Sequence, residues 1–93
     1  MNHVVEMIEI KINKRDSQLI GNLKTMIMQM QNNNHQLLDI NFLTNQFISG
    51  NFCIILVWDR IDDLSKASSV ANLIIDYLKP KFLVNHSIWK KEY

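Results

Sequence analysis

Glycine, proline and cysteine are all scarce in this chain, which has Gly21, Gly50, Pro80 and Cys53 and no others of these types among 93 residues. Two glycines this far apart cannot form a glycine-rich loop that cradles phosphates. A single cysteine excludes an internal disulfide, and with no CxxC, no HExxH and no His/Cys cluster at metal-ligand spacing the sequence predicts neither a metal site nor a cofactor. We expect Cys53 to be a small buried hydrophobe rather than a nucleophile.

An excess of one charge and a long apolar run are also missing. The net charge is +1, whereas nucleic acids and anionic membranes are bound by dense cationic surfaces, so we expect neither as a partner. No apolar stretch approaches the roughly 20 residues that span a bilayer. Acidic residues within the N-terminal stretch MNHVVEMIEIKI argue against a signal peptide, so we expect a cytoplasmic protein. The length predicts one domain over residues 1–93.

Four stretches have the alternation and composition of β-strands: residues 4–12, 37–48, 52–60 and 82–90. In the first of them, VVEMIEIKI, the β-branched side chains of one face share it with a carboxylate, Glu6. The third, FCIILVWDR, is apolar on both faces, which is typical of a central strand covered on both sides.

The second and third strands are predicted to form a hairpin. In the second, strict alternation puts Leu38, Ile40 and Phe42 on one side and Leu37 on the other. The sequence SGN follows, where Gly50 supplies the positive φ that a tight turn requires.

The apolar spacing changes to the helical period twice. Gly21 interrupts the first helical pattern, and a close approach of its backbone to the sheet would explain a residue that weakens a helix by about 1 kcal/mol. Pro80 ends the second pattern. The two stripes consist of Leu19, Ile20, Leu23, Met26, Ile27 and Met30, and of Ala67, Val70, Ala71, Ile74 and Leu78.

The resulting order βαββαβ predicts an α+β, ferredoxin-like fold, a four-stranded antiparallel sheet with two helices on one face. The other face of this sheet would be bare, although the third strand is apolar on both sides. A large exposed apolar surface is rare on a monomer, so we expect a homodimer through the sheet face.

Two side chains are candidates for a pocket on the helix side. Trp58 ends the third strand, so we expect it to be partly buried at the rim of the core, where it would line a cleft with Met26, Ile27 and Met30 of the first helix. His86 shares its face with apolar neighbours in the last strand; it is either a hydrogen-bonded core group or a pocket residue, and the candidate catalytic base. If its imidazole were protonated at neutral pH, Glu6 on the neighbouring strand would be the candidate partner.

The order of elements over nearly all 93 residues, and the stretch ILVWDRIDDLSKA at residues 55–67, resemble the antibiotic biosynthesis monooxygenase-like proteins of the dimeric α+β-barrel superfamily. The resemblance implies a homodimer with facing sheets and a small ligand between each sheet and its helices. Trp58 matches a pocket tryptophan of the cofactor-independent members that oxidise polycyclic phenols. The asparagine and tyrosine of those members correspond to Ile54 and Leu64, and residues 65–79 lack the histidine of the haem-degrading members.

Three hypotheses therefore stand. The first is a small dimeric protein that binds a small apolar or aromatic molecule through Trp58, His86, Met26, Ile27 and Met30. The second is a cofactor-independent monooxygenase-like enzyme, or an isomerase, that uses His86 as a base beside Trp58. The third is a structural dimer without a ligand.

Overall fold

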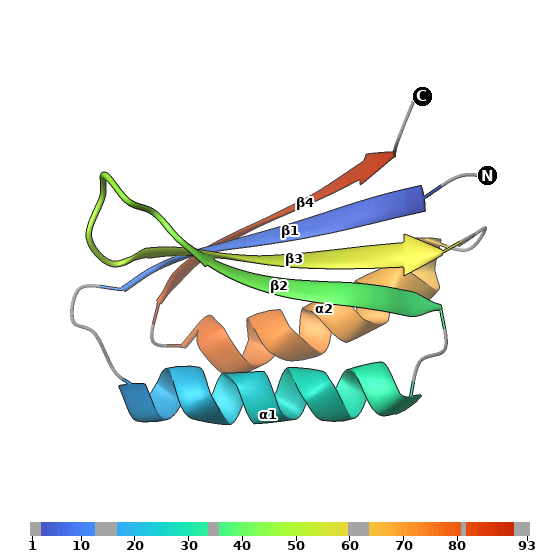
Figure 1. Ribbon diagram of the computed structural model, residues 1–93, viewed down its shortest axis with the longest axis horizontal. Coiled ribbons are helices and arrows are strands. Elements are labelled where there is room, and N and C mark those ends of the chain that lie inside the picture. The colour runs from blue at the N-terminus through green and yellow to red at the C-terminus, as the bar shows by residue number, and fades with distance from the viewer. Residues whose placement is uncertain (1–2, 13–16, 34–35, 60–63, 81, 91–93) are drawn as a thin grey trace.

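The computed structural model describes residues 3–12, 17–33, 36–59, 64–80 and 82–90, without the side chains of Ser17 and residues 64–68. Six elements follow one another in the order βαββαβ (Figure 1), as expected. They are β1 (His3–Lys11), α1 (Ser17–Asn33), β2 (Leu37–Thr44), β3 (Asn51–Asp59), α2 (Leu64–Leu78) and β4 (Leu83–Lys90).

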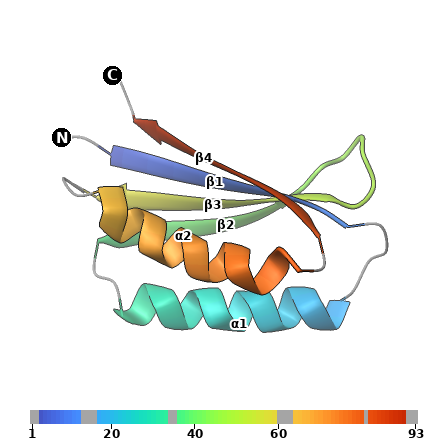
Figure 2. The ribbon, with the colours of Figure 1, turned by 180° about the vertical axis from the view of Figure 1, so that it is seen from behind.

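The strands form one antiparallel sheet in the order β2-β3-β1-β4. Both helices lie on the same face of this sheet (Figures 1 and 2), with α1 packed against β2 and α2 packed against β1 and β4. This arrangement confirms the predicted ferredoxin-like fold. Neither described helix is long and apolar enough to cross a lipid bilayer.

The core lies between the sheet and the helices. In β1 and β3 every second residue is buried beneath the helices, as the two-residue period of a strand requires. The helices contribute the inner parts of their apolar stripes. The core residues are Val4, Ile8, Ile10, Ile12, Leu19, Leu23, Ile27, Leu37, Phe52, Ile54, Leu56, Trp58, Val70, Ala71, Ile74 and Leu78.

The strand β2 differs from the prediction in its length and in its first residues. It ends at Thr44 rather than at residue 48, because the chain leaves the sheet there to form a wide hairpin. An irregularity in the β2–β3 register between Leu37 and Asp39 inserts Leu38 as an extra residue. Leu37 is therefore buried on the same side as Ile40, and Leu38 is exposed. The prediction had placed Leu38, and not Leu37, on the side of Ile40.

The two glycines have different surroundings. Gly50 has a φ of 79°, and a Cβ built on it would collide with the carbonyl oxygen of Ile12, so this turn needs glycine as expected. A Cβ on Gly21 would meet nothing within 4 Å. The expectation that Gly21 permits a close approach to the sheet is wrong.

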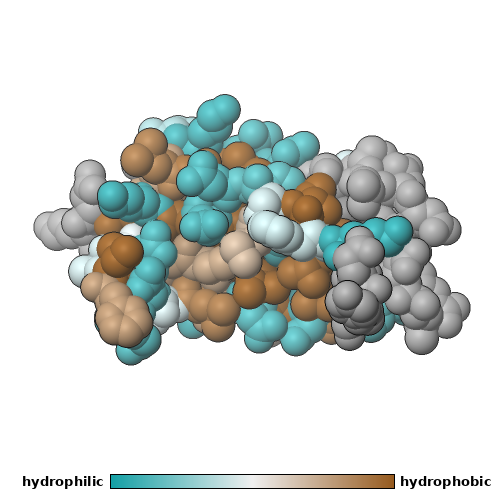
Figure 3. All heavy atoms as spheres, turned by 90° about the horizontal axis from the view of Figure 1, so that it is seen from above, coloured by the Kyte–Doolittle hydropathy of each residue, from teal (hydrophilic) through white to brown (hydrophobic). Residues whose placement is uncertain are grey.

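The sheet face without helices is largely apolar along its centre. Figure 3 views this open face, where apolar side chains gather in the middle with hydrophilic ones around and between them. The apolar side chains of the central strands are half-buried there, and those of the outer strands are exposed. Its apolar residues are Val5, Met7, Leu43, Cys53, Ile55, Val57, Leu83 and Trp89.

Candidate functional site

Glu6 is the only charged residue among the buried residues that the structure describes, and it has no solvent-exposed surface. It lies on the helix side of β1 between Val4 and Ile8, which are both core residues. Burial of an ionised carboxylate costs several kcal/mol unless partners stabilise it. The position of Glu6 therefore raises the question of which groups stabilise the carboxylate.

Both carboxylate oxygens of Glu6 have a partner on a neighbouring strand. The indole Nε1 of Trp58 donates a hydrogen bond to Oε1 at 2.8 Å. The Nε2 atom of His86 lies 2.6 Å from Oε2. A separation of 2.6 Å is shorter than the usual N–H···O range of about 2.7–3.2 Å, and hydrogen bonds to a charged acceptor are the short ones.

The sheet register explains why these three side chains meet. Trp58 of β3 pairs with Val4, and His86 of β4 pairs with Ile8. Glu6 lies between these two positions on the same face of β1. It therefore reaches diagonally to both neighbouring strands, a distance that long or aromatic side chains can cover. We call Glu6, Trp58 and His86 the carboxylate network.

The carboxylate network also fixes which imidazole nitrogen is available for chemistry. With its proton on Nε2, His86 donates to Glu6 and presents the Nδ1 lone pair as an acceptor. A carboxylate that holds one imidazole nitrogen in this way orients the ring and selects its tautomer, as in carboxylate–histidine pairs that serve as general bases. The arrangement is chemically suited to proton transfer at His86.

His86 lies at the margin of the helix-covered region. Its neighbours on the helix side of β4 are Val84, which is half-buried, and Ile88, which is partly exposed. The His86 side chain is 22% exposed, although the residue as a whole is more exposed because β4 is an edge strand. We call Val84, His86 and Ile88 the β4 shelf: an apolar surface, reached from solvent, with an imidazole in its middle.

The prediction that Trp58 is only partly buried is wrong. Trp58 is completely buried rather than partly buried at a rim, because Leu37 and Val4 flank it on both neighbouring strands and its indole nitrogen bonds to Glu6. The strand end does not leave it accessible. Glu6, the candidate partner named for a protonated His86, is within hydrogen-bond distance of it.

The predicted first-helix residues lie elsewhere. Ile27 is buried in the core and also lines an apolar cleft of about 230 Å³ between α1 and β2. Met26 and Met30 are partly buried against the core, on the opposite flank of the helical stripe from this cleft. The residues that line the cleft are Lys24, Ile27, Met28, Gln31, Ile40 and Phe42.

This α1–β2 cleft has one cationic group. The Lys24 ammonium lies 5.8 Å from the centroid of the Phe42 ring, within the range of a cation–π contact. The structure thus divides the predicted ligand residues between two places: Trp58 and His86 in the carboxylate network, and Ile27 in the α1–β2 cleft.

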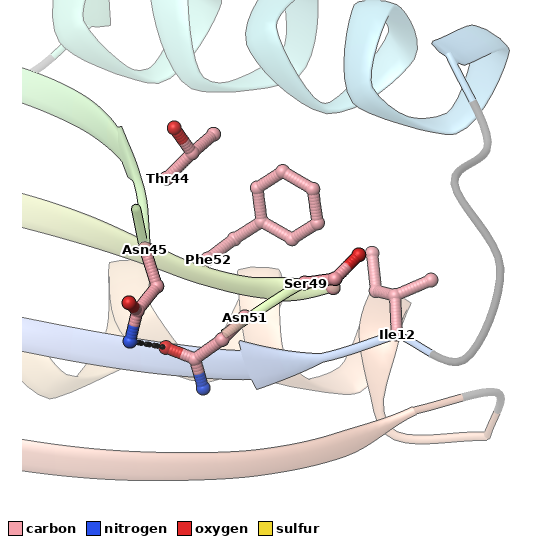
Figure 4. A pocket seen from close by; sticks show the side chains of 7 residues that line it. Ile12, Thr44, Asn45, Ser49, Asn51 and Phe52 are labelled. Carbon is pink, nitrogen blue, oxygen red and sulfur yellow. Dashed lines mark hydrogen bonds between the residues drawn. The ribbon is translucent and has the colours of Figure 1, made fainter. Parts of the chain in front are cut away.

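A second cavity, of about 260 Å³, lies at the base of the β2–β3 hairpin (Figure 4). Its lining is more polar than that of the α1–β2 cleft. Asn45 and Asn51 both line it, and Nδ2 of Asn45 donates to Oδ1 of Asn51 at 3.3 Å. Neither cavity is lined by a residue of the carboxylate network.

The expectation that Cys53 is buried in the core is wrong. Cys53 is half-buried and lies on the open face of the sheet. Burial raises the pKa of its thiol, and the negative charge of Glu9 on the neighbouring strand raises the pKa further. Both effects disfavour the thiolate, which is the reactive form. Within the described part of the chain, no group of three or more His, Cys, Asp or Glu side chains could hold a metal ion.

Each member of the carboxylate network was identifiable from the sequence, but the contacts between them were not. A carboxylate inside an apolar strand pattern is the signal that was available, because buried charges are rarely present without partners. The pairing register decides which residues lie diagonal to Glu6, and the alternation pattern alone does not supply that register.

No protein-family model matches the sequence, and no curated protein matches it. Solved structures do match the fold. SnoaB, a cofactor-independent oxygenase from Streptomyces nogalater, is 9% identical, with a TM-score of 0.75 over 100% of this chain and 96% of SnoaB. A candidate antibiotic biosynthesis monooxygenase from Deinococcus radiodurans is 18% identical, with a TM-score of 0.68 over 97% of this chain and 91% of that protein.

A dimeric ferredoxin-like protein of unknown function from Thermobifida fusca is 8% identical, with a TM-score of 0.65 over 97% of this chain and 90% of the other. These similarities confirm, at the level of the fold, the expected resemblance to the antibiotic biosynthesis monooxygenase-like proteins. Residues 60–63 of the stretch that carried the resemblance lie outside the described residues. At these identities the likeness concerns architecture, and activity has to be argued from the side chains.

Proposed function

We propose that the protein is a cytoplasmic homodimer that binds a small apolar or aromatic molecule on the helix side of its sheet, with His86 at the polar end of the site. The fully buried Glu6, bonded to Trp58 and His86, is the observation that supports this most strongly. A buried carboxylate contributes little to stability that an apolar side chain would not, so its presence favours a role in orienting His86.

The β4 shelf is the part of this face on which a ligand would lie. Val84 and Ile88 offer apolar surface on either side of the imidazole. A phenol or an enol could pack against them and direct its hydroxyl group to Nδ1 of His86. In this proposal Trp58 does not touch the ligand and acts as a positioning residue that holds Glu6.

The homodimer is proposed on the composition of the open face. Its exposed apolar residues include Leu83 and Trp89, and its centre is formed by half-buried apolar side chains of β1 and β3. An exposed surface with this many apolar side chains often marks an interaction site. Light scattering at micromolar concentration should give the mass of a dimer, and a monomer would contradict the proposal.

A thermal-shift screen against phenols, quinones, flavin and haem tests the ligand site. We expect at least one phenol or quinone to raise the melting temperature of the wild type, because a ligand that binds only the folded state stabilises it. The His86→Ala variant should lose that rise. Asn85→Ala, on the opposite face of the same strand, and Lys24→Ala, in the α1–β2 cleft, should keep it.

The alternatives give different patterns in the same screen. Loss of the rise in Lys24→Ala with retention in His86→Ala would place the ligand in the α1–β2 cleft, beside Ile27, and would contradict the role of His86. Absence of any ligand-induced rise would favour a structural dimer without a ligand.

The His86–Glu6 pair also supports a second candidate function, a cofactor-independent monooxygenase-like reaction or an isomerisation. In both reactions, Nδ1 of His86 would accept a proton from the bound phenol or enol, and the resulting anion would react with dioxygen or be reprotonated at another atom. Oxygen uptake, and exchange of substrate hydrogen for deuterium, distinguish the two reactions. Glu6→Gln should abolish either, because a glutamine amide at that position favours the other imidazole tautomer.

A further inference from the structure

The β2–β3 hairpin carries an apolar tip that nothing in the protomer covers. Phe47 is 98% exposed, the highest value of any large apolar side chain among the described residues, and the adjacent Ile48 is 53% exposed. One exposed apolar residue on a surface is ordinary. Two adjacent ones at the tip of a hairpin that borders an apolar sheet face are a candidate contact surface.

Hydrogen bonds hold this tip in one shape. Oδ1 of Asn45 accepts from the backbone N–H of Phe47 at 2.8 Å and from that of Ile48 at 3.1 Å. The Asn45 side chain is in turn bonded to Asn51 (Figure 4), and the backbone N–H of Asn45 donates to the Asn51 carbonyl at 2.9 Å. A contact residue on a preorganised loop loses little conformational entropy when it binds.

The far side of the hairpin is tied to β1. The backbone N–H of Ile12 donates to the carbonyl of Gly50 at 2.7 Å, and the space between these residues admits no side chain at Gly50. The hairpin is thus anchored at both of its ends. The direction in which it leaves the sheet is therefore a fixed property of the fold.

That direction is toward the open face. In Figures 1 and 2 the hairpin rises beyond the end of the sheet on the side away from α1 and α2. Two sheets packed face to face are separated by about 10 Å. A loop that rises from one sheet on this side would meet the second sheet or pass along its edge.

The open face is large enough for a second copy. The longest and shortest dimensions of the protomer, 39 and 19 Å between Cα atoms, span this face (Figure 3), so its area is comparable to the roughly 800 Å² that each partner buries in a stable interface. The outer strands expose apolar side chains on the same face, among them Leu43, Leu83 and Trp89. These are surfaces against which an aromatic ring can pack.

We propose that residues 45–50 form a clasp between two copies of this chain, in which Phe47 of each protomer packs against the open sheet face of its partner. The clasp rests on the proposed homodimer and adds to it the residue that contributes most to its affinity. Aromatic side chains are enriched at protein interfaces, and a few residues that become fully buried against the partner dominate the binding energy.

Sedimentation equilibrium of the full chain tests the clasp through the dimer dissociation constant. We expect Phe47→Ala to raise this constant at least about 30-fold, the effect of removing an interface hot spot. Phe47→Tyr should stay close to the wild type, because it keeps the ring. Leu73→Ala is the matched control, since Leu73 is 58% exposed on α2, on the far side of the molecule from the open face; it should change the constant less than threefold.

The outcomes separate the clasp from the homodimer. A wild type that is dimeric, with Phe47→Ala within threefold of Leu73→Ala, would overturn the clasp alone. A monomeric wild type would overturn both the homodimer and the clasp. Because Phe47 makes almost no contact inside the protomer, Phe47→Ala should keep the circular dichroism spectrum of the wild type.

Discussion

The two faces of β1 and β3 depart from the usual pattern in opposite ways. An antiparallel sheet with one covered face normally places apolar residues under the helices and polar residues toward water. Here the covered face contains a buried carboxylate, Glu6, and the uncovered face presents Val5, Met7, Ile55 and Val57. Each face thus has a feature that packing within the protomer does not explain, and we propose an oriented histidine as the reason on one face and a partner surface as the reason on the other.

Replacing the two tryptophans tests this contrast with the largest expected effect. Trp58→Ala should destabilise the protein by about 3–5 kcal/mol, the cost of removing a fully buried large aromatic, and it also leaves Oε1 of Glu6 without its donor. Trp89→Ala, on the open face at 60% exposure, should cost less than about 1 kcal/mol in the monomer. Urea denaturation of both variants at low protein concentration measures the difference, and equal costs would contradict the distinction between the faces.

Alanine substitutions at the two glycines test whether the hairpin that borders the open face has a fixed geometry. Gly50→Ala should cost about 2–3 kcal/mol, because a side chain at positive φ is strained and its Cβ would collide with Ile12. Gly21→Ala should instead stabilise the protein by about 1 kcal/mol, since it lies in open space within α1. Thermal melts report both signs. A harmless Gly50→Ala would contradict the fixed geometry of the hairpin.

Two glutamates on opposite faces of β1 give a smaller and sharper contrast. Glu6→Gln should cost about 1–3 kcal/mol, because it keeps the volume but removes the charge-assisted hydrogen bond to His86. Glu9→Gln, three residues away on the exposed face, should change the stability by less than about 0.5 kcal/mol. Chemical denaturation at neutral pH compares the two variants. The comparison fails if Glu9→Gln costs as much as Glu6→Gln.

The smallest effect concerns Cys53. Burial, and then the charge of Glu9, raise the pKa of its thiol in the folded state. As the pH rises above about 8.5, the unfolded chain therefore loses this proton before the folded protein does. The free energy of unfolding should then fall with rising pH, whereas below this range Cys53 should contribute nothing to its pH dependence.

Urea titrations between pH 7 and pH 10 measure this dependence, with Cys53→Ser as the variant that lacks it. Thiol reagents should modify Cys53 slowly in the native protein and rapidly in denaturant. Rapid labelling of the native protein, or an identical pH dependence in the two proteins, would contradict the raised pKa.

The fold was predictable from the sequence because its signals are local. Alternation and helical spacing gave the order of the elements, and Gly50 gave the hairpin turn. The inserted residue Leu38 was not predictable, since a bulge changes the parity of a strand without changing its composition.

The candidate site was predictable only in part, because it depends on contacts between strands. His86 was assigned to the correct face, and Glu6 was named as its conditional partner. The burial of Trp58 was wrongly predicted, because a position near a strand end does not reveal how closely β2 and β1 flank it. The hydrogen bond from Trp58 to Glu6 requires the pairing register, which is a property of the assembled sheet.

The role of His86 is tested most directly by the nitrogen-15 NMR spectrum of the histidine rings during titration with a phenol or a quinone that stabilises the protein. We expect the Nδ1 resonance of His86 to shift in a saturable manner, since Nδ1 is the atom offered to the ligand while Nε2 stays bonded to Glu6. The ring of His3, whose Nε2 lies 3.5 Å from Oδ1 of Asp59, should keep its shifts and serve as an internal control. A ligand that saturates the protein and leaves the His86 resonances unmoved would contradict the proposed role of His86.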